Sequence, residues 1–122
     1  THQDAAKMLG ETNMAVFRGE GGEIECRPNK PFEVRAIHDG VLSSEDWPPM
    51  LDDSRQAVDK DMDVGGLQSV WTGEIDNDYA TAAITGTLAV ALRAMGKADS
   101  IDNALAGAKA MWRDRDKARL GV

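Results

Sequence analysis

The acidic run DKDMD, residues 59–63, has the composition closest to a cation-binding loop. Its three aspartates alternate along the chain, as the first oxygen ligands of a calcium-binding EF-hand loop do. Such a loop also needs a glycine at its sixth position and a bidentate glutamate at its twelfth. The sequence has Val64 and Val70 at these positions. We therefore predict a solvated acidic loop rather than a calcium site.

The glycine-rich segment RGEGGE, residues 18–23, raises the question of a phosphate-binding loop. It has neither the G-x-G-x-x-G spacing of a dinucleotide site nor the Lys-Ser/Thr pair of a Walker loop. Its two glutamates, Glu20 and Glu23, would repel a phosphate group because the charges have the same sign. The segment is predicted to be a simple hairpin connection.

Cysteine and histidine chemistry has little support in the sequence. Cys26 and His38 are a possible nucleophile–base pair, but no third group that would orient the base is evident. His2 and His38 are far apart, and neither has a Cys or His at metal-ligand spacing, so a zinc site is not predicted. The other carboxylates and the tryptophans are predicted to be helix caps, surface charges and packing anchors: Asp46, Asp52, Asp53, Glu74, Asp76, Asp78, Trp47, Trp71 and Trp112.

The composition limits the class of protein. A chain of 122 residues with 42% apolar and 29% charged residues is typical of one globular domain, or a fragment of a domain, spanning residues 1–122. A net charge of -7 argues against a stand-alone nucleic-acid binder, which needs clustered Lys and Arg. The single cysteine, Cys26, excludes an internal disulfide and predicts a cytoplasmic location. No apolar run is long enough to span a membrane.

The elements that would position these residues follow from hydrophobic periodicity and turn residues. We expect a short helix whose apolar face carries Ala5, Met8 and Leu9, then about three strands with a tight turn at Asp39-Gly40, and then a helical C-terminal half. The expected helices cover residues 4–9, 52–60 and 67–74, the strands cover 14–17, 24–27 and 32–38, and the breaks cover 43–53 and 65–66. Leu67, Val70 and Trp71 are expected to face inward.

Residues 76–119 predict two helices joined by a tight turn, an antiparallel helix hairpin. The first helix has no charge between Asp78 and Arg93, and its apolar stripe is predicted to comprise Ile84, Leu88, Ala91, Leu92 and Met95. Most of its other positions are Ala, Gly or Thr, which let neighbouring elements approach closely, so the helix is expected to be buried on several sides. Gly96 is expected to end it in a left-handed conformation, and Asp99 or Ser100 to cap the second helix. The apolar stripe of the second helix is predicted to comprise Ile101, Ala104, Leu105, Ala108, Met111 and Trp112.

Two stretches resemble a known family. The segment VWTGEIDNDYATAAITGTLAVALRAMGKADSIDNALAGAKAMW resembles the C-terminal end of anthranilate phosphoribosyltransferases, and AVFRGEGGEIECRPNKP resembles the strand and loop before it, as found in the divergent, glycosyltransferase family 3-like branch. The matched positions in the first segment are Gly73, Glu74, Asp78, Ala82, Ala83, Leu92, Gly96, Lys97, Ala98, Ser100 and Ala108. The similarity extends from Val16 to about Arg119.

The resemblance implies an α/β fold in which this chain is the C-terminal third of a larger transferase-like protein and forms the C-terminal part of its phosphoribosyltransferase-like catalytic domain. Family members have an additional N-terminal helical domain, bind phosphoribosyl pyrophosphate with magnesium and act as homodimers. Their phosphate-binding segments, a Gly-Thr-Gly-rich loop and a Lys-His-Gly-Asn-Arg-like segment, lie upstream and are not present in these residues. The chain alone is therefore expected to have no catalytic or cofactor-binding residues, and its partner is expected to be the N-terminal part of the same protein.

The resemblance also implies a degenerate magnesium loop. The family's "GLDE" loop, aligned through Gly19 and Gly22, places its Asp-Glu pair on Ile24 and Glu25. The loss of the first carboxylate removes a hard oxygen ligand from magnesium, and Glu23 replaces it only if the loop shifts by one residue. The candidate metal ligands are therefore Glu25 and Glu23.

Two alternatives stay open for the parent protein. The divergent branch includes nucleic-acid-binding members that are not enzymes. Near the glycine-rich loop, however, four basic residues are balanced by four glutamates, so a nucleic-acid surface would have to come mainly from the upstream part. These residues are Arg18, Arg27, Lys30 and Arg35, with Glu20, Glu23, Glu25 and Glu33. The other alternative is a structural or dimerisation module whose apolar face packs on the N-terminal portion.

Overall fold

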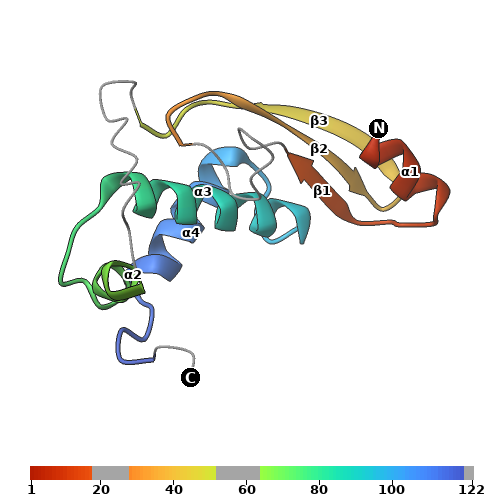
Figure 1. Ribbon diagram of the computed structural model, residues 1–122. Helices are drawn as coiled ribbons and strands as arrows, with labels where there is room; N and C mark the ends of the chain where they lie inside the picture. The colour runs from red at the N-terminus through yellow and green to blue at the C-terminus, as the bar shows by residue number, and fades with distance from the viewer. Residues whose placement is uncertain (18–27, 52–63, 120–122) are drawn as a thin grey trace.

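The computed structural model describes residues 1–17, 28–51 and 64–119. Within these ranges the chain is a mixed α/β protein with a three-stranded sheet and four helices (Figure 1). In chain order the elements are α1 (His2–Met8), β1 (Met14–Phe17), β2 (Phe32–His38), β3 (Val41–Trp47), α2 (Val64–Thr72), α3 (Asp78–Ala94) and α4 (Ile101–Arg113). The predicted strand at 24–27 and helix at 52–60 lie outside the described residues.

The sheet is antiparallel throughout, in the order β1-β2-β3. The Asp39-Gly40 turn joins β2 to β3 as predicted, and both residues have positive φ, 48° and 81°, as a two-residue hairpin turn of the I′ type requires. The prediction that residues 43–53 are irregular is wrong for the first part of that range, because β3 continues to Trp47. Pairing with β2 and the burial of Trp47 extend the strand, and Pro48, which has no amide hydrogen to donate, follows its last residue.

Helix α1 forms close to its predicted place, and the apolar residues of its predicted face are exposed. Met8 and Leu9 are 88% and 86% exposed, and the helix has no buried residue. A polar contact fixes it instead: the Gln3 amide donates from Nε2 to the carbonyl oxygens of Ala36 and Ser43, at 2.8 and 3.0 Å. The apolar residues of so short a helix therefore do not identify its contact surface.

Helix α2 begins earlier than the sequence suggests. Gly65 and Gly66 were expected to break the helical pattern, yet both lie in its first turn. The unfavourable helix propensity of glycine applies mainly to helix interiors. Val70 is buried and Trp71 half-buried, as predicted. The inward orientation expected for Leu67 is wrong, since its side chain is 56% exposed.

The predicted helix hairpin is present, with α3 packed against α4 (Figure 1). Gly96 has a φ of 71° and forms a Schellman motif: its amide donates to the Arg93 carbonyl at 3.1 Å, and the Lys97 amide donates to the Leu92 carbonyl at 2.9 Å. Of the two predicted caps, Ser100 is the N-cap of α4, and its hydroxyl accepts from the Asn103 amide at 3.1 Å.

The small residues of α3 are buried, as expected, but only part of the predicted apolar stripe is. Leu88 and Leu92 pack against the core, but Ile84, Ala91 and Met95 of the expected stripe are exposed. The buried face is made of small residues, Ala82, Ala83, Thr85, Gly86, Ala89 and Val90. Small side chains let neighbouring elements approach the α3 backbone closely. In α4, Met111 of the predicted stripe is likewise exposed.

The core lies between the inner face of the sheet and the α3–α4 pair (Figure 1). Its fully buried members come from β2, β3, α3 and α4, and are Val34, Trp47, Ala89, Val90, Ala104 and Ala108. Aromatic rings extend this layer across the three strands: the Phe17 and Phe32 centroids are 5.8 Å apart, and those of Phe32 and Trp47 are 5.7 Å apart. The predicted role of Trp47 as a packing anchor is confirmed, with 1% of the residue exposed.

Candidate functional site

Most of the residues that the sequence analysis considered as metal ligands or catalytic groups lie outside the described part of the chain. Glu23 and Glu25, the candidate magnesium ligands, lie there, as do Cys26, the glycine-rich segment and the acidic run 59–63. Within residues 1–17, 28–51 and 64–119, no three His, Cys, Asp or Glu side chains come close enough to hold a metal ion. The magnesium loop therefore stays a prediction.

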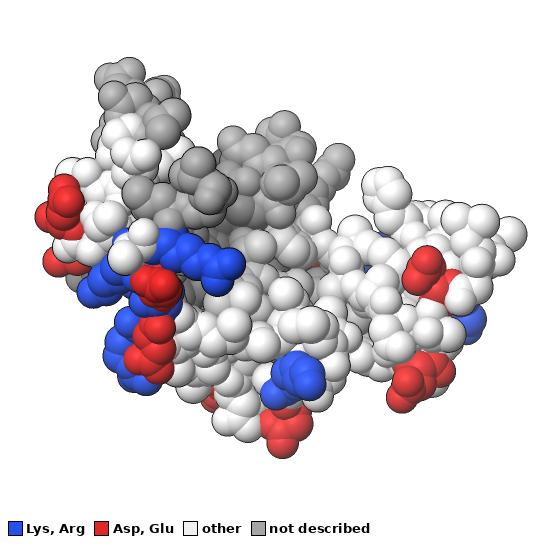
Figure 2. All heavy atoms as spheres, turned by 90° about the horizontal axis from the view of Figure 1, so that it is seen from below, with Lys and Arg blue, Asp and Glu red and all other residues white. Residues whose placement is uncertain are grey.

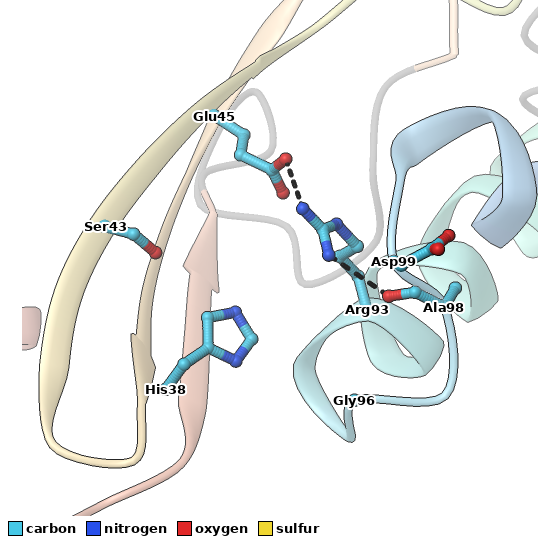
Figure 3. Close-up of a pocket in the computed structure, with 7 residues that line it drawn as sticks. All are labelled: His38, Ser43, Glu45, Arg93, Gly96, Ala98 and Asp99. Carbon is cyan, nitrogen blue, oxygen red and sulfur yellow. Dashed lines mark hydrogen bonds and ion pairs between the residues drawn. The ribbon is translucent and has the colours of Figure 1, made fainter.

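The structure points instead to an open pocket of about 480 Å³ between the β2–β3 hairpin and the turn that joins α3 to α4 (Figure 3). Most of the side chains in its lining are polar or charged. The lining residues are His38, Ser43, Glu45, Arg93, Gly96, Ala98 and Asp99. Sequence positions about 50 apart are thus brought together by the packing of the sheet on the helix hairpin.

The sheet register places three of these side chains on one face. Ser43 pairs with Ala36, and His38 lies two residues further along β2, so both belong to the same face. Glu45 is two residues after Ser43 and shares that face as well. Figure 3 shows the His38 ring, the Ser43 hydroxyl and the Glu45 carboxylate all directed from the hairpin toward the side of the pocket where Arg93 lies.

Arg93, in the last turn of α3, connects three segments of the chain. Its NH2 nitrogen contacts Glu45 Oε2 at 2.7 Å, and its NH1 nitrogen donates to the Ala98 carbonyl at 3.1 Å. The two charged side chains are only 23% and 30% exposed. Within the described residues, the buried Nε of Arg93 has no hydrogen-bond partner. A guanidinium with this many contacts fixes the sheet relative to the helix hairpin.

The electrostatics of the pocket disfavour an anion. Arg93 and Glu45 neutralise each other, which leaves the Asp99 carboxylate as an excess negative charge among the lining groups. Asp99 Oδ1 accepts from Asn103 Nδ2 at 2.6 Å, and in Figure 3 this carboxylate points away from the space between His38 and Arg93. The hydrogen-bonding groups of His38, Ser43 and Glu45 face that space, and the small residues Gly96 and Ala98 line the rest of the pocket.

A second cluster of aromatic and cationic groups has a structural explanation. The Arg115 guanidinium lies 3.7 Å from the centre of the Trp112 ring and 5.5 Å from that of Trp71. It also donates to the carbonyl oxygens of Trp71, Trp112 and Val70, at 2.8, 2.5 and 3.3 Å. One guanidinium therefore caps the C-terminal carbonyls of both α2 and α4, where the helix dipoles favour a positive charge. This cluster joins the two helices and leaves the Trp112 face covered.

Sequence reasoning missed the pocket because its parts carry no local signature. Glu45 and Arg93 are 48 residues apart, and Glu45 lies in a segment that was expected to be irregular. The one available signal was Arg93 itself, which is the first charge after a long uncharged helix. A single arginine of this kind predicts a partner but does not identify it.

Comparison with known proteins adds no assignment. The chain matches no protein-family model, and no curated protein matches it. In the described residues, no helix combines the length and the apolar character needed to cross a membrane. The family resemblance therefore remains a sequence-based expectation.

Proposed function

We propose that this chain is the C-terminal structural segment of the catalytic domain of a cytoplasmic glycosyl- or phosphoribosyltransferase-like protein, inactive by itself. The residues that carry the resemblance fall mainly on α3, the Gly96 turn and α4. The turn and cap chemistry of Gly96 and Ser100 accounts for part of the shared pattern, because both residues are needed to connect the helices.

The single observation that carries the proposal is the character of α3. No residue from Tyr79 to Leu92 is charged, although the face opposite the buried one is open to solvent. On that face Ile84 is 39% exposed, and Met95, the residue that follows the last residue of α3, is 62% exposed. A helix without charges on any side is typical of one that is covered all round. The covering surface in this proposal is the N-terminal part of the same protein.

In this proposal the parent protein, rather than this chain, holds the phosphates. The sequence contains no phosphate-binding loop, and the described residues contain no metal-ligand cluster. Phosphoribosyl pyrophosphate and magnesium would bind to upstream residues, with Glu23 or Glu25 as a possible additional ligand. The parent would be a homodimer, as the resemblance implies.

A calorimetric titration tests the proposal directly. We expect the 122-residue chain to show no binding of phosphoribosyl pyrophosphate with magnesium at micromolar concentrations. A chain extended upstream, with the Gly-Thr-Gly-rich loop included, is expected to bind. Micromolar binding by these 122 residues alone would contradict the proposal, and so would an upstream sequence that lacks any phosphate-binding loop.

The face of the molecule shown in Figure 2 does not support a nucleic-acid-binding role for this chain. Figure 2 shows Lys and Arg side chains next to Asp and Glu side chains, with an uncharged area between these groups. The net charge is -7. Affinity for a phosphate backbone needs cations gathered on one surface, and this face of the described residues has none that is exclusively basic.

A further inference from the structure

The pocket beside Arg93 contains hydrogen-bonding groups to which no other described residue is bonded. Within the described residues, the His38 imidazole and the Ser43 hydroxyl have no hydrogen-bond partner. Glu45 gives one carboxylate oxygen, Oε2, to Arg93, and no described group donates to the other. The hairpin therefore presents an imidazole ring, a hydroxyl and one carboxylate oxygen that no described group contacts to the same space.

These groups lie on a rigid frame. His38 and Ser43 are diagonal neighbours on the paired strands β2 and β3. Ser43 and Glu45 are two residues apart on β3, so their side chains lie on the same face. The Glu45 carboxylate is held from the opposite side by Arg93, which is itself fixed to the Ala98 carbonyl (Figure 3). A site on strands, with its central charge already oriented, loses little conformational entropy when a ligand binds.

The lining excludes several classes of ligand. Arg93 is already paired with Glu45, so it offers no free guanidinium to an anion such as phosphate. The described residues offer no three-ligand set for a metal ion. A large apolar ligand needs a pocket lined mainly by hydrophobic side chains. Here only Gly96 and Ala98 lack a polar side chain, and they offer little apolar surface. A neutral molecule with neighbouring hydroxyl groups fits, because each hydroxyl both donates and accepts.

We propose that this pocket is a binding site for a small neutral polyol of the monosaccharide type, whose hydroxyl groups donate to Glu45 and exchange hydrogen bonds with Ser43 and His38. The site is built by the β2–β3 hairpin and the α3–α4 turn of this chain. It does not depend on the proposed role of α3, so either proposal can fail without the other.

Amide chemical shifts of the full 122-residue chain, recorded during titration with D-glucose and with D-ribose, test this site. We expect saturable changes at residues around Ser43 and Gly96 for at least one sugar, with a dissociation constant on the order of millimolar because the ligand is small. Ser43→Ala is expected to weaken binding by a factor on the order of five, the usual effect of losing one hydrogen bond. Ser44→Ala is the matched control, since Ser44 lies on the opposite face of β3.

Inorganic phosphate and 1,4-diaminobutane serve as the anionic and cationic comparison probes. Stronger binding of either probe at these amides would overturn the assignment to a neutral polyol. The same holds for an absence of saturable changes with both sugars up to concentrations on the order of 100 mM. Equal affinity of Ser43→Ala and the control variant, with both variants folded as judged by their amide spectra, would also overturn it.

Discussion

Arg93 is the residue through which the sheet and the helix hairpin share a polar contact. It is the only charged residue of α3 after Asp78. Its side chain contacts Glu45 on β3 and the Ala98 carbonyl in the turn between α3 and α4. Because the side chain is mostly buried, a truncation leaves the Glu45 carboxylate without its cation and the Ala98 carbonyl without a donor. The loss of buried partners costs more than the loss of an exposed ion pair.

We expect Arg93→Ala to lower the free energy of unfolding by about 1–2 kcal/mol. Urea denaturation of Arg93→Ala, Glu45→Gln and the double variant measures the coupling between the two residues, expected at about 1 kcal/mol. Arg113→Ala is the control, because Arg113 pairs with its neighbour Asp114 at 73% and 68% side-chain exposure. Its effect is expected to stay within about 0.5 kcal/mol. Additive effects of Arg93→Ala and Glu45→Gln would show that the ion pair does not contribute.

The Glu33–Arg35 pair on the outer face of β2 links stability to pH. The hydrogen bond from Arg35 Nε to Glu33 Oε1, at 2.6 Å, and the charge of Arg35 lower the pKa of Glu33. A carboxyl whose pKa is lower in the folded state stabilises the fold above its unfolded pKa of about 4.3, and this contribution disappears as the pH falls through the folded pKa.

Glu33→Gln is therefore expected to flatten the loss of stability below about pH 4.3 and to leave its slope near neutral pH unchanged. Thermal unfolding followed by circular dichroism across this range measures both slopes. Because the pair is exposed to solvent, the difference should shrink in high salt. An unchanged acid slope in the variant would show that the pair has no effect on folding.

At the scale of the elements, the turn between α3 and α4 depends on one backbone conformation. Gly96 has a φ of 71°, where a Cβ causes strain although no atom lies within 4 Å of its position. Gly107, in the middle of α4, has helical geometry, and a Cβ there would meet only the end of the flexible Leu92 side chain at 3.4 Å. The same substitution at these two glycines should therefore have opposite effects.

Gly96→Ala is expected to destabilise the fold by about 1 kcal/mol through backbone strain. Gly107→Ala is expected to stabilise it by up to about 1 kcal/mol, since alanine has the higher helix propensity. Chemical denaturation of the two variants beside the unsubstituted chain gives both signs in one experiment. Stabilisation by Gly96→Ala would mean that the left-handed turn is not formed in solution.

Elements with local signals were predictable from the sequence, and their contact faces were predictable only in part. The Asp39-Gly40 turn, the Gly96 helix end and the Ser100 cap depend on neighbouring residues only, so their sequences determine them. The buried face of α3 depends on how closely α4 approaches. Small residues form this face, whereas the larger Ile84 and Met95 are exposed. The pocket depends on the pairing of Glu45 with Arg93, which no local pattern encodes.

At the scale of the whole molecule, the exposed face of α3 is the feature that the described chain leaves unexplained. It is uncharged, it lies opposite the packed face, and it carries Ile84 and Met95. Exposed apolar patches of this kind mark surfaces that contact another protein or another part of the same protein. Without its natural cover, such a face is expected to associate with other copies of the chain.

Sedimentation equilibrium of the isolated chain tests this claim most directly. We predict that its average mass rises above that of the monomer as the concentration increases through about 10–500 µM, and that the double variant Ile84→Glu with Met95→Glu returns it to the monomer mass. Met111→Glu, at a 51% exposed position on α4, is the matched control and should leave the association unchanged. A monomeric chain at every concentration, with cooperative unfolding and no difference between these variants, would contradict the account.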